Sequence, residues 1–299
     1  MNFANWMSAL KDDVKLVDVV MPGSHNSGCR NIIELANCQD GSLAEQVCYG
    51  VRQFCIKTDT NRITKKPVFS HSIIKAGLLE TDFKELRSVL DENSSEFLIL
   101  DIRKYGDEHF GPFTYKCKSD NNKIDGLIEK YLTPEKYALT DFRKISDVTM
   151  GDIRKSGKRY LIINSDEEYR FSKNCDYENP WSPERHGRKA EVFAERATEV
   201  FDNVEKNGIF VLQTQQTGGF GTEIGLLTPR KADKTFRPYY DIIINKIKNN
   251  PLYLEKVNVI SSDYMTEDYF KAKRILLLNL MKGNIKKECE EEFTELVRY

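Results

Sequence analysis

The chain has 299 residues, of which 30% are charged and 40% hydrophobic, and its formal net charge at pH 7 is −1. This composition is typical of a globular protein long enough for one large domain or two ordinary ones, and the absence of a basic excess argues against nucleic acid as a partner. No apolar run approaches the roughly 18 residues of a membrane span, and the first residues lack the pattern of a signal peptide. We therefore expect no transmembrane span and a protein that is cytoplasmic or secreted without a visible signal peptide.

Apolar runs and amphipathic segments follow one another along the chain. The apolar runs predict strands over residues 16–20, 53–57, 68–71, 97–102, 160–164, 209–214 and 257–261. The segments with helical spacing predict helices over residues 5–11, 42–48, 82–90, 124–131, 188–205, 234–248 and 267–281. Ser42 with Glu45 three residues later has the pattern of a capping box, which marks a helix start.

This alternation of strands and helices predicts a parallel sheet covered by helices. With about seven strands and no internal linker, we expect a single domain over residues 1–299. Its fold class would be α/β, a distorted TIM-type barrel of parallel strands with outer helices. A doubly wound sheet is the alternative. In a barrel, the catalytic groups gather at the C-terminal ends of the strands.

The seven cysteines contain no C-x-x-C pair, which argues against a zinc site and against a complete disulfide framework. We interpret most of them as free thiols of a reducing compartment. A bridge from Cys29 to Cys38 or Cys48 stays open.

A glycine-flanked loop near the N-terminus is the main candidate for chemistry. Residues 22–28 read PGSHNSG and follow an apolar run, so His25 would lie at the C-terminal tip of a strand. His71, another of only four histidines, ends a second predicted strand. Two histidines at one end of a barrel form a candidate acid–base pair, because the imidazole pKa lies near neutral pH.

Seven segments, in order along the chain, resemble the X-type catalytic domain of phosphatidylinositol-specific phospholipase C over most of its length. They are residues 21–28 (MPGSHNSG), 49–57 (YGVRQFCIK), 69–71 (FSH), 96–103 (EFLILDIR), 150–154 (MGDIR), 210–214 (FVLQT, with Gly218-Gly219) and 259–264 (VISSDY). The resemblance implies an enzyme that cleaves phosphatidylinositol, or a glycosylated relative, to diacylglycerol and inositol 1,2-cyclic phosphate.

The resemblance also implies a role for each matching residue. His25 would be the general base, His71 the general acid, and Asp263 the carboxylate that orients His25. Asn26 stands where metal-independent members carry an aspartate that assists the general acid. An amide there can hold His71 by a hydrogen bond but supplies no charge.

The residues expected around His25 and His71 favour the metal-independent bacterial-like type of the family. Calcium-dependent members carry acidic ligands where this chain has Cys55, Lys57 and Arg103. We therefore expect no cofactor and no metal, with Lys57 stabilising the phosphate oxygens and Arg103 binding the substrate. Lys57 replaces the arginine that metal-independent members carry, and lysine lacks the bidentate fork of arginine.

Polar and apolar loop residues complete the expected site. Asp166, Trp181 and Arg185 are candidates for substrate binding, and Phe220, Leu226 and Leu227 for an apolar rim that dips into a membrane. Basic residues near that rim could attract anionic lipid: Arg230, Lys231, Lys234 and Arg237. The expected partner is a phosphatidylinositol-type lipid at a membrane surface, bound by a monomeric peripheral protein.

Two other functions compete with this one. The chain could be a catalytically weak or inactive inositol-lipid-binding protein of the same fold, which Asn26 and Lys57 would favour. Alternatively, it could be a metal-dependent phosphodiesterase of a related barrel, with Asp59 and Glu34 as the candidate ligands.

Overall fold

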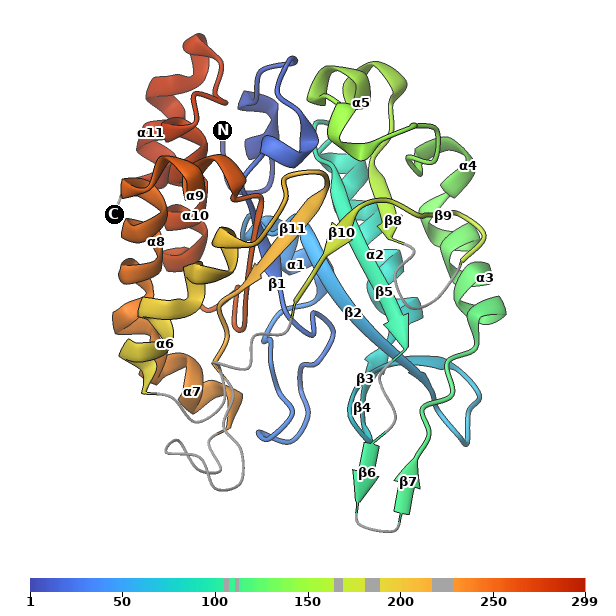
Figure 1. Cartoon of the computed structure of the whole chain (residues 1–299). Helices are drawn as coiled ribbons and strands as arrows, with labels where there is room; N and C mark the ends of the chain where they lie inside the picture. Colours follow the sequence, from blue (N-terminus) through green and yellow to red (C-terminus); the bar gives the residue numbers. More distant parts are fainter. Residues whose placement is uncertain (105–107, 111–112, 164–168, 181–188, 217–227, 299) are drawn as a thin grey trace.

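The structure is a computed structural model that describes residues 1–104, 108–110, 113–163, 169–180, 189–216 and 228–298. Its centre is a curled sheet with the strand order β10-β11-β12-β1-β2-β5-β8-β9 (Figure 1). All neighbours in this order pair in parallel. Within the described residues β9 and β10 do not pair, so the sheet is a half-barrel, and the predicted α/β barrel class is confirmed.

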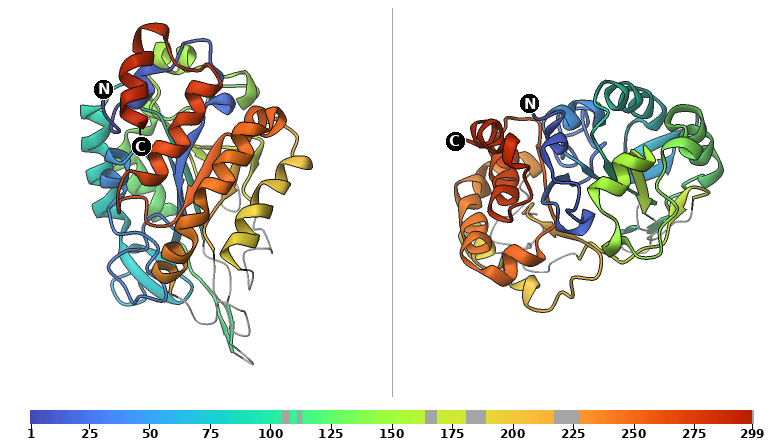
Figure 2. Two further views of the ribbon diagram at one scale, coloured as in Figure 1. Left: turned by 90° about the vertical axis from the view of Figure 1, so that its left-hand side faces the viewer. Right: turned by 90° about the horizontal axis from the view of Figure 1, so that it is seen from above.

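The strands and helices have the following bounds. The strands are β1 (Met21–Ser24), β2 (Gln53–Thr60), β3 (Pro67–His71), β4 (Ile74–Leu78), β5 (Leu98–Lys104), β6 (Glu108–Phe110), β7 (Phe113–Tyr115), β8 (Tyr160–Ile163), β9 (Ser172–Lys173), β10 (Tyr177–Glu178), β11 (Ile209–Gln213) and β12 (Val259–Ser262). The helices are α1 (Leu43–Cys48), α2 (Leu79–Glu92), α3 (Asn121–Leu132), α4 (Pro134–Tyr137), α5 (Met150–Ser156), α6 (Ala190–Arg196), α7 (Pro229–Phe236), α8 (Tyr240–Asn249), α9 (Pro251–Lys256), α10 (Phe270–Met281) and α11 (Glu290–Val297). The helices surround the sheet when the molecule is seen along the barrel (Figure 2). None of the described helices is both long and apolar enough to cross a membrane.

The inside of the half-barrel changes character along its length. At the N-terminal ends of the strands, inward residues such as Ile99 and Val259 pack against Trp6 and Leu10, so the N-terminal segment closes that end with an apolar plug. Towards the C-terminal ends, the same inward faces of β2 and β5 carry Lys57 and Arg103. Polar side chains therefore occupy the inside of the half-barrel at the C-terminal ends of the strands, and we call this region the polar mouth.

The predicted first strand is displaced. Residues 16–20 are not a strand: Leu16–Asp18 forms a 3-10 turn, and β1 begins at Met21. Two buried amides take the place of a strand partner. Asn258 donates to the carbonyls of Leu16 and Val19, and Asn279 bonds both backbone groups of Val20. Apolar periodicity does not reveal such side-chain partners for the backbone.

Two predicted helices are divided, and a third is shorter. The helix expected over 234–248 is split by a 3-10 turn, Arg237–Tyr239, because Pro238 lacks the N–H that a continuous helix needs. The helix expected over 188–205 is α6 followed by a 3-10 segment, Ala197–Asp202. At 5–11 only a 3-10 turn forms, Trp6–Ala9. The capping box is confirmed, since Ser42 and Glu45 cap α1 reciprocally.

Candidate active site

His25 and Asp263 meet at the polar mouth. Residue 25 follows β1 and residue 263 follows β12, and these two strands are parallel neighbours. Their C-terminal ends therefore coincide, and His25 Nδ1 lies 2.8 Å from Asp263 Oδ1. Both residues are buried, with 7% and 3% of their surface exposed. A carboxylate on Nδ1 orients the ring and leaves Nε2 as the reactive nitrogen.

Two long polar side chains, Gln39 and Lys271, donate hydrogen bonds to the backbone of the His25–Asp263 pair. Gln39 Nε2 donates to the carbonyls of His25 and Ser262, at 2.8 and 3.1 Å. Lys271 Nζ donates to the carbonyl of Asp263 and forms a buried ion pair with Asp233. The backbone on both sides of the His25–Asp263 contact is thus fixed by buried hydrogen bonds, which favours one orientation of the imidazole.

His71 approaches the pair from an antiparallel hairpin. β3 pairs antiparallel with the end of β2 and with β4, so the expectation of a parallel barrel strand at His71 is wrong. β2 continues to Thr60, and β3 pairs with its last three residues. A Cβ on Gly28 would lie 2.0 Å from the ring of Phe69. The missing side chain at Gly28 therefore lets β3 pack against the His25 loop.

The pKa of His71 is lowered from 6.5 to about 4, mainly by burial and in smaller part by the nearby charge of His25, against a smaller opposing effect of Asp263. The group that the resemblance makes the general acid is therefore uncharged at neutral pH in the free protein. A bound phosphate diester would bring a negative charge next to it, which favours the imidazolium. Substrate binding and protonation of His71 are thus expected to be coupled.

Asn26 lies in the same loop with a left-handed backbone, at φ 43°. Its Nδ2 donates to Cys38 Sγ at 3.7 Å, and its Oδ1 is buried without a hydrogen-bond partner among the described residues. Asparagine tolerates this conformation better than most residues.

Lys57 and Arg103 are direct neighbours on the inward face of β2 and β5. Asp101 accepts two hydrogen bonds from the guanidinium of Arg103. The sequence pattern did not indicate Asp101 as a site residue. Burial alone would lower the pKa of Arg103, but Asp101 raises it above its usual range. Asp101 is not one of the positions compared with the calcium ligands of the family, and its charge is balanced by its pairing with Arg103.

Further polar residues line this mouth. The hydroxyl of Tyr177 donates to Asp101 Oδ2 at 2.8 Å, and Asn179 Nδ2 lies 3.2 Å from that hydroxyl. Gln213 Nε2 donates to Asn179 Oδ1. Gln213 lies inside a segment that carries the family resemblance, whereas nothing in the sequence pattern around residues 177–179 indicates a site.

The groups that could bind a metal do not form an oxygen-rich site. Among the described residues, His25, Cys38 and Asp263 offer ligand atoms within 4.8 Å of one another. Sulfur and imidazole suit soft or borderline ions, whereas calcium takes six to eight oxygens. Of the two carboxylates considered as metal ligands, Asp59 forms an ion pair with Lys75 and accepts a hydrogen bond from Tyr115, and Glu34 is exposed.

Several expected site residues lie outside the described residues: Asp166, Trp181, Arg185, Phe220, Leu226 and Leu227. The seven cysteines all lie within the described residues and are present as thiols; Cys29 and Cys38 are buried, and Cys38 lies close to His25.

The lowered pKa of His71 predicts an acid-dependent loss of stability. Because the unfolded state binds the proton more tightly, the stabilisation is complete above pH 6.5 and is lost as the pH falls towards 4. Protonation of His71 accounts for a loss of about 3 kcal/mol of unfolding free energy between pH 7 and pH 4. We expect urea unfolding at pH 7 and pH 4 to differ less in His71→Gln than in the wild type, by about that amount. An identical pH dependence of the two proteins would contradict the burial argument.

Searches against protein-family models and against curated proteins give no match. Solved structures do match. The phosphatidylinositol-specific phospholipase C of Listeria monocytogenes aligns with a TM-score of 0.65 and 17% identity, over 93% of this chain and 99% of that one. A Staphylococcus aureus phosphatidylinositol-specific phospholipase C, from a study of its membrane binding, aligns with a TM-score of 0.64 and 16% identity over 93% and 97%. The chain thus has the fold of these bacterial proteins.

Proposed function

We propose that this protein is a phospholipase C, formed as one catalytic domain over residues 1–299, that cleaves phosphatidylinositol-type lipids without calcium. One observation carries the proposal: the buried His25–Asp263 pair lies at the mouth of the half-barrel with His71 beside it. The fold shared with bacterial phosphatidylinositol-specific phospholipases C supports it.

The proposed reaction is an intramolecular transfer followed by release. His25 Nε2 takes the proton of the inositol 2-hydroxyl, and that oxygen attacks phosphorus to form the cyclic 1,2-phosphate. The bond from phosphorus to the diacylglycerol oxygen breaks, and His71 gives its proton to that oxygen. Asp263 stabilises the charged His25 through Nδ1. Lys57 and Arg103 face the same space and would stabilise the charge on the phosphate oxygens.

The test is the release of inositol phosphate from phosphatidylinositol vesicles, with and without a chelator. We expect turnover that persists in chelator and yields the cyclic product first. Loss of turnover in chelator would support a metal-dependent phosphodiesterase instead. Vesicle binding without any turnover would support the alternative of an inositol-lipid-binding protein, in which Asn26 and Lys57 have reduced catalysis.

The mouth also carries apolar side chains suited to a membrane surface. Ile33 and Leu35, in the loop after His25, are 56% and 55% exposed, and Ile73, in the turn after His71, is 46% exposed. Of the basic residues expected to attract lipid, Arg230 and Arg237 are instead paired with Asp40, Glu267 and Asp268. We propose that the loops that carry Ile33, Leu35 and Ile73 provide the membrane contact.

Replacing Ile33 and Leu35 by serine is expected to weaken vesicle binding by roughly tenfold or more, because each buried aliphatic side chain contributes about 1.5–3 kcal/mol. Cosedimentation with phosphatidylinositol vesicles measures this. The control is Leu252→Ser/Met281→Ser. It changes two exposed apolar residues, one on α9, which leads into the start of β12, and one at the last residue of α10. Equal binding of the two double variants would contradict the membrane contact.

A further inference from the structure

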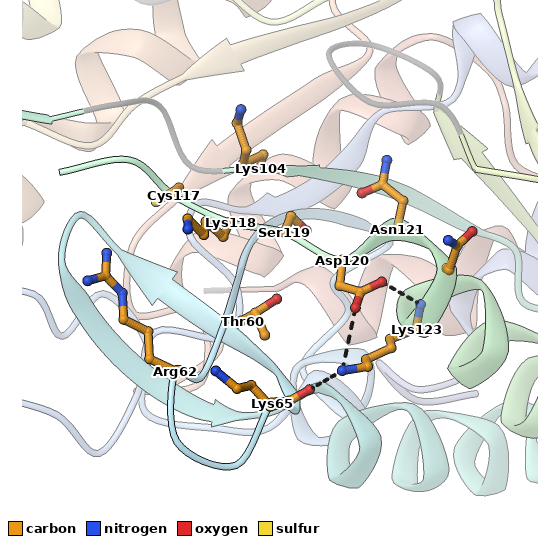
Figure 3. Close-up of a pocket in the computed structure, with 11 residues that line it drawn as sticks. Thr60, Arg62, Lys65, Lys104, Cys117, Lys118, Ser119, Asp120, Asn121 and Lys123 are labelled. Atoms are coloured by element: carbon orange, nitrogen blue, oxygen red, sulfur yellow. Dashed lines mark hydrogen bonds and ion pairs between the residues drawn. The ribbon is translucent and has the colours of Figure 1, made fainter. Parts of the chain in front are cut away.

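A basic pocket of about 690 Å³ lies beyond the strand ends, outside the candidate active site. It is formed by the turn after β2, the end of β5 and the segment that leads into α3 (Figure 3). Its lining includes five basic side chains and one acidic one: Arg62, Lys65, Lys104, Lys118, Lys123 and Asp120. In a chain of net charge −1, this is a strong local concentration of positive charge.

The pocket is separate from the mouth of the half-barrel. Successive side chains of a strand point to opposite faces. Lys57 and Arg103 face inward, so their neighbours Thr58 and Lys104, which pair with each other, face outward. Thr60 lies on the same outward face as Thr58 and lines the pocket. A ligand there would lie behind the strands that carry the active-site cations, so it cannot be the diester that is cleaved.

Most of the positive charge in the pocket is available to a ligand. Asp120 caps α3 and forms an ion pair with Lys123 at 3.4 Å. Arg62, Lys65, Lys104 and Lys118 form no ion pair with any residue that the structure describes. The hydroxyl of Thr60 is buried and likewise has no hydrogen-bond partner there.

Hydrogen bonds to β2 hold the segment before α3, which forms one wall of the pocket. Ser119 and Thr58 share a hydrogen bond of 2.8 Å, and Thr58 donates to the carbonyl of Arg103. Asp59 accepts from the backbone N–H of Lys118 at 2.9 Å. The segment before α3 is therefore fastened to β2, which keeps the cations around a preformed space and lowers the entropic cost of binding.

We propose that this pocket binds a phosphate monoester, either as a soluble molecule or as the phosphorylated headgroup of a lipid. A monoester carries a charge of about −1.5 to −2 at pH 7 and three acceptor oxygens, which suits several cations around one space better than a carboxylate or a diester does. The volume lies within the range of small-molecule sites, so it has room for a group attached to the phosphate. The proposal does not depend on the proposed catalysis.

Calorimetric titration with inorganic phosphate tests the site. The background is Lys57→Ala, which weakens anion binding at the candidate active site. In that background Lys65→Glu/Lys118→Glu is expected to lower phosphate affinity by at least about tenfold, because two attractions become repulsions. Lys155→Glu/Lys287→Glu makes the same charge change on exposed residues of α5 and the turn before α11, and is expected to leave the affinity unchanged. Equal affinity in the two double variants would overturn the proposal.

Vesicles identify the source of the phosphate. Phosphatidylcholine vesicles with phosphatidylinositol 4-phosphate are compared with phosphatidylcholine vesicles with phosphatidylinositol. If Lys65→Glu/Lys118→Glu weakens binding to the phosphorylated lipid only, the ligand is a headgroup. If it weakens only the binding of inorganic phosphate, the ligand is soluble. A circular dichroism spectrum and melting temperature like those of the wild type exclude misfolding as the cause.

Discussion

Replacing His25 by alanine is expected to lower turnover of phosphatidylinositol by on the order of 10²- to 10⁴-fold, the usual contribution of a general base. The imidazole is the group that Asp263 and the buried hydrogen bonds of Gln39 hold in one orientation. Binding of the lipid should change little, since a group that acts in the transition state contributes to kcat more than to KM. The measurement is the rate of cyclic inositol phosphate release.

The matched control is His109→Ala, because residue 109 lies in the β6–β7 hairpin and not among the strand ends that form the site. Asp263→Asn should lower kcat in the same direction as His25→Ala, because an amide no longer favours the tautomer with its proton on Nδ1. A His25→Ala protein with the wild-type rate would contradict the assigned role, even if the protein still bound vesicles.

The sequence was sufficient to predict the parts of the site that depend on strand ends. The apolar run before Asp263 coincides with β12, and β1 lies between the apolar run of residues 16–20 and His25, so both residues follow the C-terminal ends of parallel neighbours. That Asp263 is the partner of His25 was expected only from the family resemblance. The hairpin that carries His71 was not predictable from periodicity, because β3 alternates like any strand and its direction depends on its partners. The contact of Gly28 with Phe69 joins the two loops, and a glycine in a sequence does not reveal its neighbour.

Contacts between distant segments explain most of what the sequence did not indicate. Asp101 binds Arg103 two residues away, but it also accepts from Tyr177, 76 residues later. The charge of Arg103 is therefore partly neutralised by a network that spans β5 and β10. For this reason we expect Lys57 to stabilise the charge on the phosphate oxygens more strongly than Arg103 does. Only the folded chain brings these groups together.

The largest effect on stability is expected at a buried ion pair far from the site. Arg52 and Glu96 are fully buried. Glu96 Oε2 accepts from Arg52 Nε at 2.7 Å, and the guanidinium also donates to the carbonyls of Phe3 and Ala4. This pair fastens the N-terminal plug to the start of β2. Glu96→Gln would leave the guanidinium charge buried without compensation, which costs about 3–5 kcal/mol of unfolding free energy.

Urea unfolding of Glu96→Gln at neutral pH measures this loss, with Asp91→Asn as the control. That change removes the surface pair of Arg87 with Asp91, spaced i,i+4 on α2, and such pairs contribute about 0.3–0.5 kcal/mol. A loss below about 1 kcal/mol in Glu96→Gln would contradict the argument. The double change Arg52→Met/Glu96→Leu separates charge from hydrogen bonding. It removes both charges but also the donor to the carbonyls of Phe3 and Ala4, so it is not expected to restore the wild-type stability.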